Sequence, residues 1–168
     1  EGEGEGEGEG EGEGEGEGEG EGEGEGEGEG EGEGEGEPPC VGDFTVSSTA
    51  DDPDATDDGD CATAADECTL RAALAEAQGR APVPSVICVP PALGAIVASG
   101  SYTVTAAEIL VDGGRNMLAG GGDDRLFVVG TLADLTLRHL TLAGGRSTSD
   151  AAAALVQAGA RLRLEDVV

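Results

Sequence analysis

Short runs of strand-forming residues that recur at a fixed spacing are the feature that most constrains the fold of this chain. Residues 133–141 align with residues 160–168 at an offset of 27, and residues 126–128 align with residues 154–156 at an offset of 28. A repeat of this length, with strands and no helix between them, is typical of a β-solenoid, in which each coil stacks on the one before it. The sequence therefore predicts a mainly β fold, a parallel β-helix, over residues 83–168.

The repeat also predicts where the coil bends. Leu135 and Leu137 alternate with polar residues, and the pattern restarts at Leu140 after the pair Arg138-His139. Alternate side chains of a strand point to opposite faces, so this restart indicates a tight corner that returns leucine to the inner face. Asp166 stands in the place of His139 one repeat later. An imidazole can act as an acid or base, but we interpret His139 as part of a solvated turn.

A single amphipathic helix is expected over residues 69–78. Its apolar residues Leu70, Ala73, Leu74 and Ala77 recur at the spacing of one helical face. The first coil of a solenoid exposes unpaired strand edges, which natural proteins cover. The helix is thus expected to close the front end of the β-helix.

Residues 1–37 alternate strictly between Glu and Gly and hold 19 of the 37 acidic residues. Glycine loses the most backbone entropy on folding, and the tract offers no apolar surface to bury, so we expect it to be disordered. The rest of the chain has 18 acidic residues, 8 arginines and no lysine. An acidic chain without clustered cations is not expected to bind nucleic acid.

Three segments follow from these patterns. Residues 1–39 form the acidic tract with its Pro-Pro linker, residues 40–82 form an N-terminal cap (a strand, an acidic loop and the helix), and residues 83–168 form the coils. Because the pattern stops inside a coil, we expect further coils beyond Val168. No apolar run reaches the roughly 18 residues that a membrane-spanning helix needs.

The four cysteines lack the spacing of a zinc site, which favours disulfides and an oxidising compartment. Of the three pairings that four cysteines allow, we favour a local bond between Cys61 and Cys68 and a longer one between Cys40 and Cys88. The alternative for Cys88, in the apolar run Val86–Val89, is a small buried residue.

Six aspartates crowd the loop over residues 51–60: Asp51, Asp52, Asp54, Asp57, Asp58 and Asp60. Calcium prefers six to eight oxygen ligands from a flexible backbone, so this loop is a candidate calcium site. Thr56 stands where an EF-hand needs its third ligand, and no Glu occupies the twelfth position. A solvated acidic loop remains the alternative, and no other cofactor is expected.

Parallel β-helices also carry polysaccharide-active enzymes of the pectin lyase type, which gives a second functional hypothesis. The candidate catalytic carboxylates are Asp112, Asp123 and Asp124. Glycoside hydrolysis needs two carboxyl groups held across the scissile bond. Asp123 and Asp124 follow three glycines, however, a pattern typical of a turn. A structural or interaction protein therefore remains the first hypothesis.

The segment from Cys61 through Cys68-Thr69-Leu70-Arg71-Ala72-Ala73-Leu74 resembles the CSLREA-motif family of secreted bacterial β-helix proteins, which includes polymorphic outer-membrane-protein-like repeat proteins. The similarity extends to residues 44–52, 59–61, 100–104, 125–129 and 140–145. Thr69 replaces the Ser of the motif and Ala72 replaces its Glu. Thr69, Leu70, Arg71, Ala73 and Leu74 carry the match in the helix.

The resemblance implies an exported or cell-surface protein with a right-handed parallel β-helix and an N-terminal capping helix. It implies adhesion or surface display toward an unknown surface, matrix or glycan partner. It does not specify a ligand.

Overall fold

The computed structural model describes residues 40–122, 125–146 and 153–168. The Glu-Gly tract, whose disorder the sequence predicts, lies outside the described residues. So do two of the three candidate catalytic carboxylates, Asp123 and Asp124.

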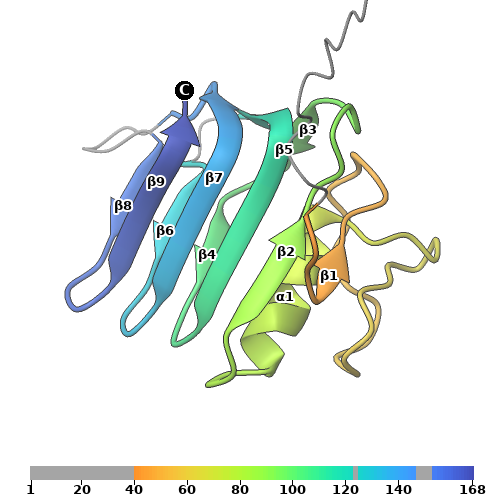
Figure 1. Cartoon of the computed structure of the whole chain (residues 1–168), viewed down its shortest axis with the longest axis horizontal. Coiled ribbons are helices and arrows are strands. Elements are labelled where there is room, and N and C mark those ends of the chain that lie inside the picture. Colours follow the sequence, from red (N-terminus) through yellow and green to blue (C-terminus); the bar gives the residue numbers. More distant parts are fainter. Residues whose placement is uncertain (1–39, 123–124, 147–152) are drawn as a thin grey trace, which may run out of the picture. The chain divides into compact units, whose positions relative to one another are not determined.

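The described part is mainly β with a single helix (Figure 1). The elements in chain order are β1 (Phe44–Thr45), α1 (Leu70–Gly79), β2 (Ser85–Cys88), β3 (Ile96–Ala98), β4 (Tyr102–Val104), β5 (Glu108–Gly120), β6 (Phe127–Val129), β7 (Asp134–Ala143), β8 (Ala154–Val156) and β9 (Arg161–Val167).

The strands form two sheets in which every described pairing is parallel. The larger sheet has the order β1-β2-β5-β7-β9, with β3 paired to the later part of β5. The smaller sheet has the order β4-β6-β8. Figure 1 shows β4, β6 and β8 as a layer behind the larger sheet. The prediction of a mainly β fold with parallel strands is confirmed.

The register tests the two offsets read from the sequence. Leu135 pairs with Leu162, as the offset of 27 predicts. In the smaller sheet Phe127 pairs with Ala154, so the predicted offset of 28 is wrong by one residue and the true offset is again 27. The backbone hydrogen bonds agree with this correction, because the Leu126 carbonyl accepts the Tyr102 amide and the Ala153 carbonyl, 27 residues later, accepts the Phe127 amide.

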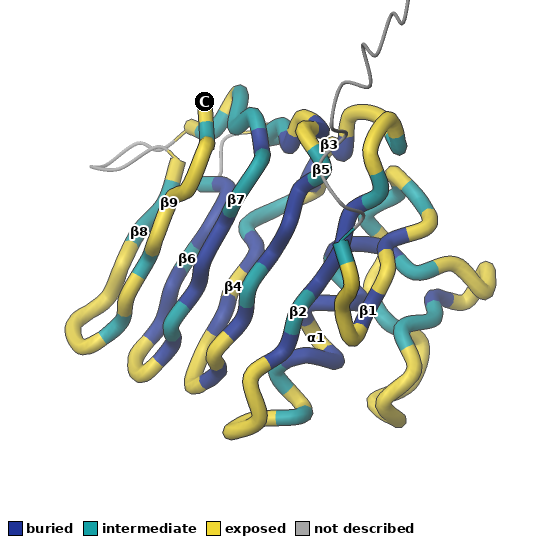
Figure 2. Tube along the Cα trace, in the orientation of Figure 1, coloured by how far each residue is buried: buried dark blue, intermediate teal, exposed yellow. Residues whose placement is uncertain are grey.

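Equivalent side chains stack into apolar columns between the sheets. One column in the larger sheet runs from Ile87 through Val111 and Leu137 to Leu164. Its first three members are 0% exposed, whereas Leu164 on the last strand is 55% exposed. Figure 2 shows the same gradient from buried inner strands to exposed β8 and β9. Burial of each residue in the column therefore depends on a paired strand on both sides.

The predicted corner is present in β7. Leu135 and Leu137 are buried, His139 has a positive φ of 51°, and Leu140 is buried again. The left-handed backbone at His139 reverses the face on which the following side chains lie, which restores leucine to the core.

The matching corner in β5 has more residues than the corner in β7. It contains a glycine that no other residue could replace unless the neighbouring backbone moved. The register of β5 and β7 shifts between Asp112 and Asn116. Gly114 has a φ of +55°, and a Cβ atom there would lie 2.2 Å from the Val89 carbonyl oxygen. Backbone proximity and the left-handed conformation both favour glycine at this position.

Helix α1 starts one residue later than predicted, at Leu70, because Thr69 is its N-cap. The Thr69 hydroxyl accepts a hydrogen bond from the Ala72 amide at 3.0 Å, which satisfies one of the free donors of the first turn. The predicted stripe of Leu70, Ala73, Leu74 and Ala77 is buried. The helix contacts β2 and β4, so it covers strands of both sheets.

Two disulfides brace this end of the molecule. They join Cys40 to Cys88 and Cys61 to Cys68, the pairing that the sequence favours, and leave no free cysteine. The first ties the start of the described chain to β2, and the second lies just before α1. In the described part of the chain, no helix is long and apolar enough to cross a membrane.

We predict unequal stabilisation by the two disulfides. Their sequence separations are 48 and 7 residues. Loop-closure entropy then predicts that Cys40→Ala/Cys88→Ala lowers the free energy of unfolding by about 4 kcal/mol and Cys61→Ala/Cys68→Ala by about 2 kcal/mol. Urea denaturation measures both variants. Equal losses would show that the longer bond does not restrict the unfolded chain as this account requires.

Candidate functional site

Asp112, Arg138 and His139 form a polar cluster at the corner of the larger sheet. Asp112 on β5 is the register neighbour of Arg138 on β7, and its side chain is 8% exposed. One carboxylate oxygen accepts hydrogen bonds from Nε and a terminal nitrogen of Arg138 at 3.0 and 2.8 Å. The other lies 3.0 Å from Nδ1 of His139. The structure thus joins two residues that the sequence marks separately as candidates.

This cluster keeps Asp112 ionised. Burial alone would raise the pKa of Asp112, but hydrogen bonds from His139, Arg138 and the Gly114 amide outweigh it and hold the pKa below the ordinary value of 3.8. A carboxylate with these partners cannot supply a proton near neutral pH, as the acid of a glycosidase must. Its visible role is to fix the β5 and β7 corners to each other.

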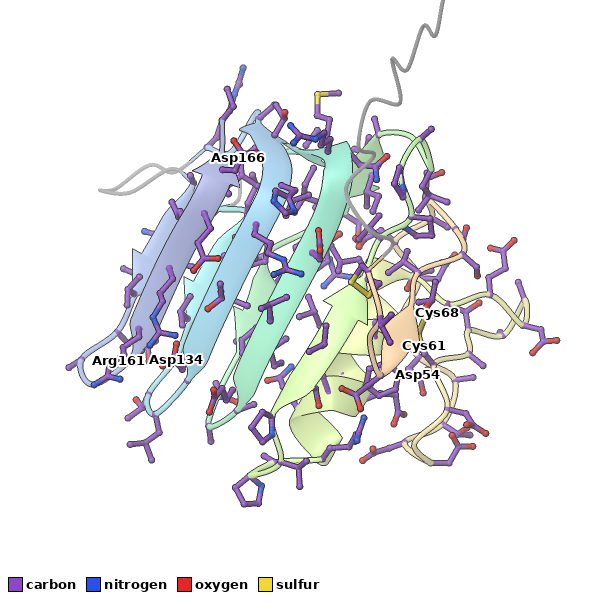
Figure 3. All side chains as sticks on the ribbon, in the orientation of Figure 1. Asp54, Cys61, Cys68, Asp134, Arg161 and Asp166 are labelled. Atoms are coloured by element: carbon purple, nitrogen blue, oxygen red, sulfur yellow. A yellow bond between two sulfur atoms is a disulfide. The ribbon has the colours of Figure 1, made fainter. Side chains whose placement is uncertain are left out.

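The interpretation of this corner as a solvated turn is wrong for His139 and right for Asp166. The His139 side chain is 19% exposed because it turns back toward Asp112. Asp166 is 59% exposed and lies 3.5 Å from Arg115 (Figure 3). The strand before His139 offers the Asp112 carboxylate. The equivalent position before Asp166 is Arg138, which is already paired with Asp112, and Asp166 lies on β9 at the edge of the sheet.

A shallow pocket of about 80 Å³ adjoins the cluster. Its lining comes from three successive corners and consists of Arg115, His139, Leu140, Thr141, Asp166 and Val168. The volume would admit only a few waters or a very small molecule. It does not resemble a groove that could hold a sugar chain.

A second polar cluster joins α1 to β4 and the turn before it, and is centred on Asp51. One carboxylate oxygen accepts hydrogen bonds from Arg71 at 2.7 Å and from the Ser99 amide and hydroxyl at 2.6 and 2.7 Å. The other accepts the Tyr102 hydroxyl at 2.7 Å. Asp51 therefore joins α1, the turn before β4 and β4 itself. We call these four residues the cap clasp.

Arg71 extends the cap clasp. Its guanidinium donates to the carbonyls of Gly100 and Ser101 and lies 4.6 Å from the centre of the Tyr102 ring. A guanidinium over an aromatic face adds a cation–π attraction to the ion pair. One side chain of α1 thus contacts the Asp51 carboxylate, the turn before β4 and the Tyr102 ring.

Electrostatics support the cap clasp. Burial would raise the pKa of Asp51, but hydrogen bonds from Arg71, Tyr102 and Ser99 outweigh it and lower the pKa below 3.8. Burial, and then the bond to the Asp51 carboxylate, raise the pKa of the Tyr102 hydroxyl far above its ordinary value of 10.0. Asp51 is thus charged and Tyr102 neutral at physiological pH, the states that the observed bonds require.

The six aspartates of the candidate calcium loop are not gathered around one point. Asp51 belongs to the cap clasp, and Asp52 uses its backbone carbonyl to accept the Thr69 hydroxyl. Asp54 and Asp58 accept amide or hydroxyl hydrogens within their own turns. Within residues 40–122, 125–146 and 153–168, no three acidic, His or Cys side chains are placed to hold a metal ion. The calcium hypothesis therefore gains no support from the described residues, Asp57 and Asp60 included.

Sequence reasoning missed Tyr102, Ser99 and Glu76 as polar anchors. Tyr102 is the single tyrosine of the chain, and a buried tyrosine hydroxyl needs a hydrogen-bond partner. The sequence could therefore have predicted a polar contact at this residue. Glu76 is 2% exposed on the covered side of α1. Glu76 lies four residues after Ala72 and therefore on the same face of the helix, and this spacing could have indicated that Glu76 is buried.

Comparisons of the chain with family models, curated proteins and solved structures find no match.

We predict that the cap clasp depends on the Asp51 charge. Asp51→Asn leaves the partly buried Arg71 without its ion-pair partner and should lower the free energy of unfolding by about 3 kcal/mol. Because the folded-state pKa is lowered, the Asp51 contribution is present above the ordinary pKa and is lost as pH falls through the folded value. Thermal denaturation at neutral and acidic pH measures both effects.

Asp52→Asn is the matched control, since it removes a neighbouring charge from an exposed side chain. It should leave stability nearly unchanged. Equal loss in the two variants would mean that general charge in the loop, and not the cap clasp, controls stability.

Proposed function

We propose that residues 83–168 are coils of a right-handed parallel β-helix, closed at the first coil by the cap of residues 40–82. We further propose that the protein is an exported or cell-surface scaffold with a structural, adhesive or interaction role. Its membership of the CSLREA-motif family is part of this proposal.

The alternation of strands between the sheets supports the coil. From β4 onward the chain passes between the smaller and the larger sheet at each successive strand, and each long strand returns beside its predecessor. Parallel neighbours cannot be joined by a hairpin, so the chain must cross over between them. Crossover connections of this kind are almost always right-handed.

The in-register apolar columns are the observation that carries the proposal. Val111, Leu137 and Leu164 occupy one column, and Tyr102 and Phe127 are neighbours in another, with ring centres 5.5 Å apart. The side chains of these columns fill the space between the sheets and serve only in packing. The outer faces then remain as the surface that can meet a partner.

The cysteines support export. Two disulfides and no free thiol are compatible with an extracellular location, where such bonds persist. The resemblance of residues 61–74 to a family of secreted proteins points the same way.

Asp112 favours a scaffold over a polysaccharide-active enzyme. It is the one candidate carboxylate among the described residues, and Arg138 and His139 engage both of its oxygens. The neighbouring pocket of about 80 Å³ is too small for a sugar ring with its glycosidic neighbour. An anchored corner is the simpler role for this carboxylate.

We predict binding without turnover. The oxidised chain, immobilised and exposed to a panel of extracellular matrix proteins and of neutral and acidic polysaccharides, should retain one class of partner and cleave none. Retention is measured by surface plasmon resonance, and cleavage by newly formed reducing ends and by absorbance of unsaturated products.

Asp112→Asn is the test variant for the enzyme alternative. Cleavage that is abolished by Asp112→Asn, with an unchanged melting temperature, would replace the scaffold by an enzyme. Failure to retain any partner would contradict the interaction role.

A further inference from the structure

The larger sheet ends at a long strand with an open edge. Strand β9 has seven residues, and within the part of the chain that the structure describes its one strand neighbour is β7. Figure 1 shows β9 as the last strand of this sheet. Natural proteins protect such edges with very short strands, lysines or prolines. The β9 sequence Arg-Leu-Arg-Leu-Glu-Asp-Val has neither Lys nor Pro, so its edge is suited to pairing with a further strand.

The backbone hydrogen bonds show which residues of β9 face that edge. The Arg161 amide donates to the Ala133 carbonyl at 2.8 Å, so the backbone groups of Arg161 point toward β7. Successive residues of a strand direct their N–H and C=O groups to opposite sides. The backbone groups of Leu162 and Leu164 therefore point away from β7, toward the open edge.

The side chains of β9 are suited to a partner of mixed charge. Leu164 lies on the inner face and is 55% exposed, so it is the incompletely covered end of its apolar column. Arg163 and Glu165 alternate with it and lie on the outer face. Arg163 is 3.2 Å from Asp134 on β7, yet half of its side chain remains exposed. The strand holds two arginines and two acidic residues, so it carries no net charge although the chain is acidic.

We propose that β9 pairs antiparallel with β9 of a second copy of this chain, with Leu164 on the two-fold axis. In this register the two copies of Leu164 lie opposite each other and exchange both backbone hydrogen bonds. Arg163 of each copy lies opposite Glu165 of the other, which gives two opposite-charge pairs across the interface. A two-fold contact of this kind is closed, since each copy uses the same edge.

Charge selects this register over its neighbours. Side chains that lie opposite each other must be on the same face, so the axis passes through a residue and the register changes in steps of two. Centring on Arg163 or on Glu165 places two like charges directly opposite each other. Centring on Leu162 places Arg161 opposite Arg163. Among these centres, Leu164 alone gives opposite charges without a like-charged pair.

The opposite end of the larger sheet offers β9 a much poorer partner. That end is β1, which has two residues, so a head-to-tail contact between copies would pair little of β9. Pairing of β9 with itself uses the whole strand on both copies. The proposal goes beyond the scaffold role, because it needs only the open edge of the sheet.

The test is charge complementation, measured by sedimentation of the full chain over a range of concentrations. The unaltered chain should dimerise. Arg163→Glu alone and Glu165→Arg alone each place like charges at both pairs, so each should raise the dimer dissociation constant by about tenfold or more. An equimolar mixture of the two variants should restore the dimer, with one copy of each, because both pairs then join opposite charges.

Arg161→Glu is the matched control. It reverses an exposed arginine of the same strand that also approaches Asp134, at 3.7 Å (Figure 3). In the proposed register Arg161 lies opposite Val167 of the second copy, so this variant should dimerise nearly as well as the unaltered chain.

Three results would overturn the proposal. The first is a monomeric unaltered chain at all concentrations. The second is a dimer that neither single variant weakens, which would place the contact on another surface. The third is a mixture of the two variants that associates no better than each variant alone. Equal weakening by Arg161→Glu would also count against it, because general charge and not the register would then control association.

Discussion

Parallel pairing in register between successive long strands is the constraint on which the rest of this structure depends. Because Leu135 lies beside Leu162 and Val111 beside Leu137, each apolar side chain meets its equivalent from the neighbouring turn of chain. A slip of one residue would move every leucine of a strand to the outer face. The corner residue His139 protects this arrangement, since its left-handed backbone returns Leu140 to the core after the bend.

The same constraint creates the problem that the cap solves. A stack of parallel strands has edges that are open to further pairing, and these edges need cover. Helix α1 covers strands of both sheets and is held there by Asp51 and Arg71 rather than by apolar contact alone. Acidic residues therefore have two different duties in the cap. Asp51 forms an ion pair with Arg71, and Glu76 accepts the backbone amides of Asp58 and Gly59 from the acidic loop.

Local and repetitive features could be read from the sequence, whereas side-chain hydrogen bonds between distant segments could not. The disulfide between Cys40 and Cys88 is the long-range contact that could be anticipated, because four cysteines allow only three pairings. Alternation gives the strands and the corner, and the 3.6-residue period gives the helix, since both depend only on near neighbours. Strand β3 was missed because Ile96–Ala98 pairs with the end of β5 rather than repeating a pattern. The contact of His139 with Asp112 and the bonds from the Asp58 and Gly59 amides to Glu76 were missed because folding brings together residues that no spacing rule connects.

In-register parallel pairing is tested most directly by an engineered disulfide between neighbouring strands. Thr136 and Arg163 are register partners on the outer face of β7 and β9. Thr136→Cys/Arg163→Cys should therefore oxidise readily to an intramolecular bond, detected by mass spectrometry of the unreduced chain. Thr136→Cys/Glu165→Cys places the second thiol two residues farther along the same face and should stay largely reduced. Preferential bonding of the second pair, or no bonding of the first, would contradict in-register stacking.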